Sequence, residues 1–308
     1  MKRWILLGLA LAANLCADNE IWLGAGYRYD NFDWSISGSD GTPDVMSELT
    51  WKNLQMAEIS MGAKGQLFCV GAYRLNADYA WILSGQNRDS DYAGDHKTIE
   101  YSRSCNDASK GEAWDLKIGI GHTFSLFCDT LTITPLTGYA QMEQHLKMYN
   151  GFQKIDLLYN THGHFKGLNN SYNTRWESPW VGVDLAYDPN ECLSIFGSIE
   201  AHFPYYKAKG HWNLRTDFIG DFIHKGNGRG WWYTLGGKWR LFSGLTAGLI
   251  ADASFFKVTK GTDTTTFIDA IVDSQGTVIG EQIVKGSTHI HRVHWDSYRI
   301  QVYASYEF

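Results

Sequence analysis

The sequence predicts an all-β protein, namely a closed antiparallel transmembrane β-barrel of about ten strands. Three observations predict it. Aromatic residues make up 15% of the 308 residues, and such residues favour strands and membrane interfaces. Apolar and polar residues alternate along many segments, as they do in a barrel wall with one apolar and one polar face. The connections between these segments alternate between short and long, as in bacterial outer-membrane barrels.

Composition excludes several other classes of protein. No run of 18 apolar residues is present, so the chain is not a helical membrane protein. The net charge of −6 without basic runs argues against nucleic-acid binding. A hydrophobic content of 44% is too high for a disordered chain.

The amino terminus has the pattern of an export signal. Lys2 and Arg3 precede the apolar run Trp4–Ala13, and the small residue Ala17 follows at a position suited to signal-peptidase cleavage. We therefore expect a signal peptide over residues 1–17 and a single outer-membrane barrel domain over residues 18–308. A lipoprotein anchored at Cys16 is the alternative interpretation. Either way, the chain is expected to reach the outer membrane of a Gram-negative envelope.

Ten segments alternate with a period of two residues, which is the spacing of side chains on one face of a strand. In the clearest one, Leu116, Ile118 and Ile120 alternate with Asp115 and Lys117. The predicted strands are Ile21–Tyr29, Ala57–Lys64, Tyr73–Trp81, Asp115–Phe124, Leu131–Tyr139, Trp180–Tyr187, Leu193–Phe203, Trp231–Leu241, Ala247–Phe255 and Arg299–Phe308.

The polar face of these strands carries both signs of charge and many glycines. A closed barrel with its apolar face toward lipid puts these residues in the lumen, whereas a soluble β-sandwich, the alternative fold, would expose them to water. Glycines on the same face leave room for a narrow water path. The predicted lumen-facing charged residues are Arg28, Glu58, Arg74, Asp78, Asp184, Glu200, Lys238, Arg240 and Asp252.

The connections fix the expected orientation. Four are short, whereas five are long and are expected to form outer loops: Asp30–Val45, Gly85–Gly111, Asn150–Asn173, Asn213–Gly228 and Lys260–Ser287. Ten strands with four short turns place both termini in the periplasm. Aromatic residues near strand ends are expected to form girdles at the membrane surfaces: Trp22, Trp81, Tyr187, Trp212, Trp231 and Trp239.

Two motifs resemble the omptin family of outer-membrane aspartyl-type proteases. Ser47-Glu48-Leu49-Thr50-Trp51-Lys52 is similar to the stretch that opens the second omptin strand, and Asp89-Ser90-Asp91 is similar to the omptin Asp-x-Asp pair. The resemblance implies that Asp89 and Asp91 face an Asp-x-His dyad across the barrel mouth and help to activate a water. At the matching position His211 fits the histidine, but Lys209 replaces the aspartate.

The missing aspartate weighs against proteolysis. A histidine that acts as a base needs a carboxylate to fix its tautomer and stabilise the imidazolium, and the sequence offers His211 no such partner. Asp89 and Asp91 can equally belong to a solvated turn or a loose cation site. Catalysis by Asp89, Asp91 and His211, as in an omptin-type endopeptidase, is thus the alternative function.

The stretch Ser47–Lys52, the length and the exported cysteine-bearing barrel also resemble the Protochlamydia outer membrane protein family. This resemblance implies a porin-like barrel, and so a narrow channel or a structural surface protein without protease activity. An adhesin that uses aromatic loops is a third class of function. Because about eight strands already leave a lumen that side chains can fill, only ions or small solutes would pass through ten.

The expected partners follow from this location. They are outer-membrane lipid and lipopolysaccharide, and the barrel-assembly machinery, which would recognise the last strand ending at Phe308. Disulfide links to other envelope proteins can form through the thiols left after export, at Cys69, Cys105, Cys128 and Cys192. No nucleic acid and no cofactor are expected. His289 and His291 share one strand face, but no carboxylate or cysteine completes a metal site.

Overall fold

The structure, a computed structural model, describes residues 19–67, 71–272, 274–275 and 277–308. The expected signal peptide over residues 1–17, with Cys16, lies outside the described residues, and so does Cys69.

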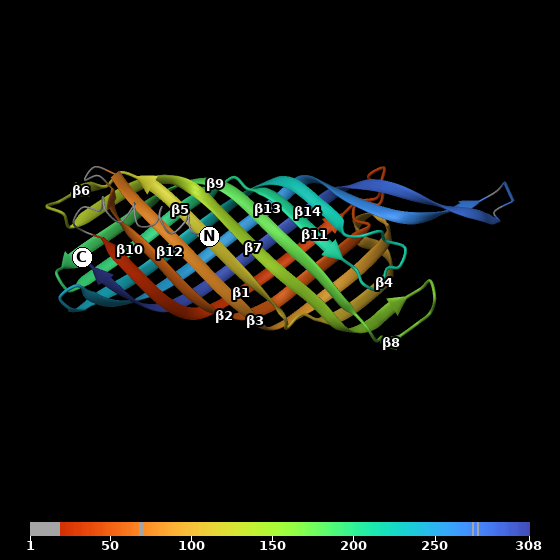
Figure 1. Ribbon diagram of the computed structural model, residues 1–308, viewed down its shortest axis with the longest axis horizontal. Helices are drawn as coiled ribbons and strands as arrows, with labels where there is room; N and C mark the ends of the chain where they lie inside the picture. Colours follow the sequence, from red (N-terminus) through yellow and green to blue (C-terminus); the bar gives the residue numbers. More distant parts are fainter. Residues whose placement is uncertain (1–18, 68–70, 273, 276) are drawn as a thin grey trace, which may run out of the picture.

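Fourteen strands form one continuous antiparallel sheet that closes on itself (Figure 1). Their bounds are β1 (Glu20–Ile36), β2 (Ser47–Leu67), β3 (Gly71–Gly94), β4 (Thr98–Asp107), β5 (Gly111–Gly121), β6 (Phe124–Leu126), β7 (Leu131–Asp156), β8 (Gly163–His164), β9 (Asn169–Asn190), β10 (Leu193–His202), β11 (Tyr205–His211), β12 (Phe222–Phe242), β13 (Leu245–Val272) and β14 (Val278–Glu307). The one helical element is the 3₁₀ turn η1 (Asp95–Lys97). No helix in the described ranges is long and apolar enough to cross a membrane.

The closed wall contains ten strand positions, which we call wall strands. Eight are single strands, whereas β5 and β4 together form one wall strand between β3 and β7, and β10 and β11 together form another between β9 and β12. β1 closes the ring by pairing with β2 on one side and β14 on the other. The ten-stranded antiparallel barrel predicted from the sequence is therefore confirmed.

The two ends of the barrel differ. At the end that we call the turn end, β12 meets β13 and β9 meets β10 in tight turns, and both termini of the described chain lie there (Figure 1). Asn19 and Phe308 exchange two backbone hydrogen bonds of 3.0 and 2.9 Å at this end. The opposite end, the loop end, carries the longer connections.

The long connections contain more strand than the sequence indicates. Most of the segment 85–111 continues β3 or forms β4, and most of 260–287 continues β13 and β14. The alternation of apolar and polar residues fades there because water wets both faces of a wall that extends beyond the bilayer. The hydrogen-bonded ladders nevertheless continue, and β13 and β14 project from the loop end as a long hairpin (Figure 1).

The outer surface carries an apolar belt. The alternation places large apolar side chains outside and their polar neighbours inside, so Ile118 is exposed while Lys117 is buried. Exposed members of the belt include Ile21, Leu23, Ile59, Met61, Leu75, Leu116, Ile118, Ile120, Val181, Val183, Ile195, Ile199, Leu235, Leu249, Ile300 and Val302. This belt is the surface that the hydrocarbon of a membrane would cover.

Four of the six predicted girdle aromatics are exposed on the outer surface, namely Trp81, Tyr187, Trp231 and Trp239. The other two predictions are wrong. Trp22 points inward, because it shares the inner face of β1 with Gly24 and lines an internal cavity. Trp212 lies beyond the end of β11 and packs edge-on against Phe222, 4.6 Å away between ring centroids. Position near a strand end does not by itself decide which face an aromatic residue occupies.

Candidate functional site

A layer of charged residues crosses the barrel near mid-height. Arg28 on β1 is fully buried and donates to Asp115 Oδ2 on β5 at 2.9 Å, and to both carboxylate oxygens of Asp30 at 2.8 and 2.9 Å. Arg299 on β14 donates to the same Asp115 oxygen and lies 3.6 Å from Asp78 Oδ2 and 3.7 Å from Glu58 Oε1. Because β1 and β5 are not neighbours in the wall, these pairs span the interior.

A second cluster continues the layer on the other side. Arg74 on β3 donates to Asp184 on β9 at 2.6 Å and to Glu200 on β10. Lys117 on β5 lies 3.3 Å from Glu200 and 3.7 Å from the centroid of the Trp232 ring. Each cation therefore has both a carboxylate and an aromatic face within reach, which offsets part of the cost of burying its charge.

The layer draws on every wall strand of the barrel. β7 contributes Gln144, which donates to Asp30 Oδ2 at 3.4 Å, and β13 contributes Asp252, which accepts from Trp232 Nε1 at 3.2 Å. The remaining eight wall strands contribute the residues described above. Hydrogen bonds, ion pairs and cation–π contacts thus join side chains from all ten wall strands in this layer.

Aromatic side chains fill the interior between this layer and the loop end. Trp176, Phe256 and Trp295 are fully buried, with ring centroids 4.9 Å apart for Phe256 and Trp295 and 5.9 Å apart for Trp176 and Trp295. Nearer the loop end, Tyr172 stacks on Trp51 at 5.4 Å. Trp295 Nε1 donates to Asp30 Oδ2 at 3.0 Å, which joins this aromatic layer to the charged layer below it.

Three inward-facing glycines make room for aromatic rings. A Cβ at Gly119 or at Gly138 would lie 2.7 Å from the ring of Trp180, and a Cβ at Gly62 would lie 2.1 Å from the ring of Trp22. The expectation that inward-facing glycines leave room for a water path is therefore wrong at Gly62 and Gly119. Period-two alternation identifies the inner face of a strand but not the side chains that enter from the opposite wall.

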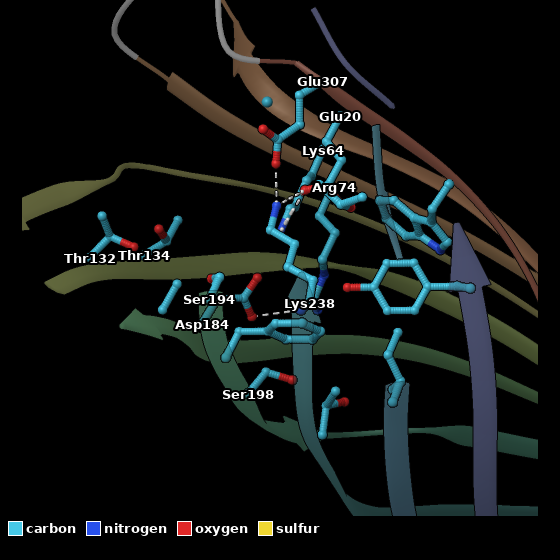
Figure 2. A pocket seen from close by; sticks show the side chains of 18 of the residues that line it. Glu20, Lys64, Arg74, Thr132, Thr134, Asp184, Ser194, Ser198, Lys238 and Glu307 are labelled. Carbon is cyan, nitrogen blue, oxygen red and sulfur yellow. Dashed lines mark hydrogen bonds and ion pairs between the residues drawn. The ribbon is translucent and has the colours of Figure 1, made fainter. Parts of the chain in front are cut away.

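A cavity of about 900 Å³ lies between the charged layer and the turn end. Lys238 donates to Glu20 at 2.9 Å and to Glu307 at 2.5 Å beside it, and Lys64 lies 3.3 Å from Glu20 (Figure 2). Arg240 is half exposed at the rim and bonds Glu307 at 3.2 Å. The floor of the cavity contains Arg74, Lys117, Glu200 and Trp232 from the charged layer.

Eight of the nine charged residues predicted to face the lumen, all except Arg240, lie in the charged layer or deeper in this cavity. The nine residues predicted to face the lumen do not include Asp115, Lys117, Arg299 and Trp232, which hold the layer together. The first three alternate with lipid-facing residues, so the signal was present. The inward orientation of Trp232 could not be recognised from the sequence, because its neighbour Trp231 is also a tryptophan and fits the outer girdle.

Asp89 and Asp91 lie on the inner side of the wall at the loop end. Leu49, the residue directly opposite Asp89 on β2, belongs to the buried core, and paired residues share one face. Burial raises the pKa of Asp89 well above its usual range, and the charge of Asp91 adds to this, whereas Arg215 opposes it. Burial also raises the pKa of Asp91, despite hydrogen bonds from Ser47 and Ser102.

The positive charge of Arg215, in the loop between β11 and β12, lowers the pKa of both aspartates. Its guanidinium binds Asp217 in a two-bond pair of 2.6 and 2.8 Å and lies 4.1 Å from the centroid of Phe218. An arginine cannot act as a base near neutral pH. It therefore occupies this side of the mouth as a fixed positive charge.

His211 lies on the outer side of β11. Its exposed side chain alternates with the buried Tyr206 and Ala208, and in the described residues no hydrogen bond or ion pair joins it to Asp89 or Asp91. The expectation that it lacks an acidic partner is wrong, since its Nδ1 lies 3.2 Å from Asp221 Oδ1. The partner comes from ten residues farther along the chain, where an Asp-x-His pattern would not find it.

Metal-binding groups are dispersed. In the described part of the chain, no three His, Cys, Asp or Glu side chains gather so that they could hold a metal ion. His294 lies 3.2 Å from Asp296 and 3.7 Å from Asp33 as part of a rim of ion pairs. Cys105, Cys128 and Cys192 form no disulfide with one another.

Comparison with solved structures supports the architecture. The outer membrane protease OmpT of Escherichia coli superposes with a TM-score of 0.76 over 94% of this chain and 97% of its own, at 10% sequence identity. The translocator domain of the autotransporter NalP of Neisseria meningitidis, at 10% identity and with 99% and 96% of the two chains covered, reaches a TM-score of 0.35. At such identities the likeness to OmpT concerns the fold alone.

A search of curated protein sequences finds no significant match. The sequence model of one family, described as Protochlamydia outer membrane protein, matches residues 22–308. The match spans nearly the whole barrel, and the barrel has the apolar belt that an outer-membrane location requires. The chain belongs to the Protochlamydia outer membrane protein family and is an outer-membrane β-barrel.

Proposed function

We propose that this protein is a structural or surface-presenting outer-membrane barrel whose lumen is closed to solutes. The observation that carries the proposal is the charged layer, which ties all ten wall strands together across the interior. An ion that entered would have to displace ion pairs such as Arg28–Asp115, whose partners are desolvated. Leaving one charge of a buried pair without its partner is costly, and removing one partner outright costs about 3–5 kcal/mol.

The aromatic layer supports the same conclusion. Trp51, Trp176 and Trp295 are fully buried. Close packing, and not only charge, therefore fills the lumen between the charged layer and the loop end. The cavity of about 900 Å³ ends at the charged layer, and it is therefore a blind vestibule in this account. A porin-like channel would need a rearrangement of both layers.

Liposome swelling tests the closed lumen. Full-length protein refolded into liposomes is expected to give no swelling in arabinose or glucose above that of empty liposomes, while a general porin reconstituted in the same lipid swells rapidly. Solute-dependent swelling at the rate of the porin control would contradict the proposal.

We also propose that the chain is not an omptin-type protease. The support is the mouth, where the charge of Arg215 acts on Asp89 and Asp91 while His211 lies on the outer side of β11. Peptides with paired basic residues are expected to survive incubation with the refolded protein. Cleavage that is lost in Asp89→Asn would instead establish the aspartates as catalytic.

The proposed orientation places the loop end outside the cell and both termini in the periplasm. In a chain without its native cysteines, Ser274→Cys at the tip of the β13–β14 hairpin should react with a membrane-impermeant maleimide on intact cells. The matched variant Ser243→Cys, in the exposed turn before β13, should stay unlabelled until the cells are lysed. The reverse labelling pattern would invert the orientation.

We propose three contacts with the envelope. Phe308 is exposed on the outer face beside Tyr306, so the last strand presents an aromatic end that assembly machinery can recognise. The apolar belt is expected to contact lipid and lipopolysaccharide. Cys128 and Cys192, both exposed, are the described thiols best placed to form disulfides with periplasmic partners in the proposed orientation.

A further inference from the structure

The β13–β14 hairpin extends well beyond the barrel wall along its long axis (Figure 1). β13 and β14 stay paired out to Val272 and Val278. Their wall neighbours stop earlier, since β12 pairs with β13 only as far as Thr264 and β1 pairs with β14 only as far as Ile290. The outer part of the hairpin is therefore a two-stranded ribbon with two edges of its own.

The two edges of this ribbon are not equivalent. The loop before β12 covers the edge of β13, where Ile219 N donates to Thr266 O and Ile268 N donates to Asp217 O, both at 2.8 Å. The edge of β14 over residues 278–288 pairs with no strand but β13 in the described part of the chain. We call residues 278–288 the open edge. Its backbone groups are free to extend the sheet.

The open edge carries apolar side chains that are exposed to water. Ile283 is 72% exposed, Ile279 65% and Val278 61%. Glu281 and Lys285 flank Ile283 and are also exposed. An exposed apolar strand edge is a template for pairing with another strand. The charges on either side of Ile283 restrict which strand fits.

The open edge is complementary to itself in one antiparallel register. If Ile283 lies opposite Ile283 of a second copy, Glu281 of each copy lies directly opposite Lys285 of the other. Residues 281, 283 and 285 share one face of the strand, so two ion pairs flank an Ile–Ile contact. Parallel pairing in register would instead oppose Glu281 to Glu281 and Lys285 to Lys285, which is destabilising.

We propose that the open edge of β14 is a homotypic docking surface that pairs the hairpins of two copies in antiparallel orientation. The hairpin runs along the barrel axis (Figure 1). Antiparallel pairing of two hairpins therefore places the two barrels at opposite ends of the joined hairpins. The two copies therefore lie in facing membranes and tether them. This inference concerns a surface outside the barrel and does not depend on a closed lumen.

A vesicle-tethering assay with charge reversal tests the pairing. Full-length protein is reconstituted into two populations of phosphatidylcholine vesicles with different lipid dyes, and doubly coloured particles are counted by flow cytometry. Wild-type vesicles are expected to tether. Glu281→Lys on both sides, or Lys285→Glu on both sides, opposes like charges twice and should weaken tethering roughly tenfold.

The decisive sample mixes the two variants. Vesicles with Glu281→Lys and vesicles with Lys285→Glu should tether each other nearly as well as wild type, because two ion pairs still form, one of them with reversed sign. The double variant Glu281→Lys/Lys285→Glu should tether to itself for the same reason. Heat-modified electrophoretic mobility, expected to be unchanged, verifies that each exposed variant has folded.

Four results would overturn the proposal. Tethering by either single variant at the wild-type level would show that Glu281 and Lys285 do not pair across the two copies. Failure of the mixed variants to tether would show that the proposed register is wrong. Tethering of vesicles that carry the protein to vesicles without protein would show that the open edge binds lipid and not a second copy. Absence of wild-type tethering in correctly folded samples would contradict homotypic docking outright.

Discussion

Arg28 donates to Asp115 across the barrel interior at 2.9 Å, and so joins the first wall strand to a residue 87 positions away. Both side chains are buried, and Asp115 is shared with Arg299. A wall strand cannot shift its register against the others without separating these charges. The pair therefore fixes the arrangement of the wall and closes the lumen at the same time.

Loss of Arg28 should be costly. Arg28→Ala leaves Asp30 and Asp115 buried with fewer partners, so the free energy of unfolding is expected to fall by about 3–5 kcal/mol. Arg240→Ala is the control, because its half-exposed ion pair with Glu307 contributes about 0–1 kcal/mol. Urea unfolding of the refolded barrel in phospholipid vesicles measures both. Equal, small effects would mean that the charged layer does not stabilise the fold.

The lipid-facing wall should reject charge. Ile118→Arg places a guanidinium in the apolar belt and should cost about 2–4 kcal/mol near the bilayer midplane, whereas Ile118→Leu should be nearly neutral. Lys117→Ala would be a mild change in a wet lumen, but here it removes a buried partner of Glu200 and a contact with Trp232. We therefore expect Lys117→Ala to destabilise the barrel too. A neutral Ile118→Arg would contradict the assignment of the faces.

The fit between Gly119 and Trp180 provides a packing test. Gly119→Ala brings a Cβ to 2.7 Å from the buried Trp180 ring, so overpacking is expected to cost about 1–3 kcal/mol. Gly237→Ala is the matched control, since its nearest atom is 3.7 Å away. The two variants are compared by urea unfolding. If both cost the same, the space beside Gly119 is not filled by Trp180.

The mouth carboxylates predict a specific pH dependence. The folded-state pKa of Asp89 is raised, so the folded chain binds more protons than the unfolded chain above about pH 4, the unfolded value for Asp. The stability from Asp89 is therefore complete below that pH and is lost as the pH rises through the folded pKa. Asp89→Asn should consequently stabilise the protein at pH 7 and have less effect near pH 4.

Asp217 is the control of opposite sign. Hydrogen bonding from Arg215 lowers the pKa of Asp217 in the folded state, so its stabilisation is present above the unfolded pKa and is lost as the pH falls. Asp217→Asn should therefore destabilise the protein at pH 7. Urea unfolding from pH 4 to pH 8 separates the two variants, and a stabilising Asp217→Asn would contradict this electrostatic description of the mouth.

The sequence predicts the strands of the barrel wall better than the side-chain contacts inside the lumen. Alternation along residues such as Asp115–Ile120 identifies the strands and their faces because a bilayer demands apolar side chains outside. The same pattern cannot reveal that Trp176 and Trp295 enter the lumen, since an aromatic residue suits either a girdle or a packed interior. Nor can it pair Arg28 with Asp115, because that contact depends on which wall strands face each other after closure.

The mouth was only partly predictable for a related reason. Asp89 and Asp91 were found by their resemblance to the omptin Asp-x-Asp pair, because residues two apart in the sequence stay close in space whether they lie on a loop or on a strand. Arg215 and Asp221 lie in a loop whose path is set by packing against β13 and by ion pairs. The partners of Asp89 and of His211 therefore required the folded structure.

The conductance of single molecules in a planar lipid bilayer tests the closed lumen most directly. Insertion of the wild-type protein is recorded in 1 M KCl, with a porin of known conductance as the positive control and quenching of tryptophan fluorescence by brominated lipid as proof of insertion. We predict that inserted wild-type molecules produce no stepwise current. Discrete ohmic steps that appear with each insertion would contradict the account, because they would require a continuous water path through the charged and aromatic layers.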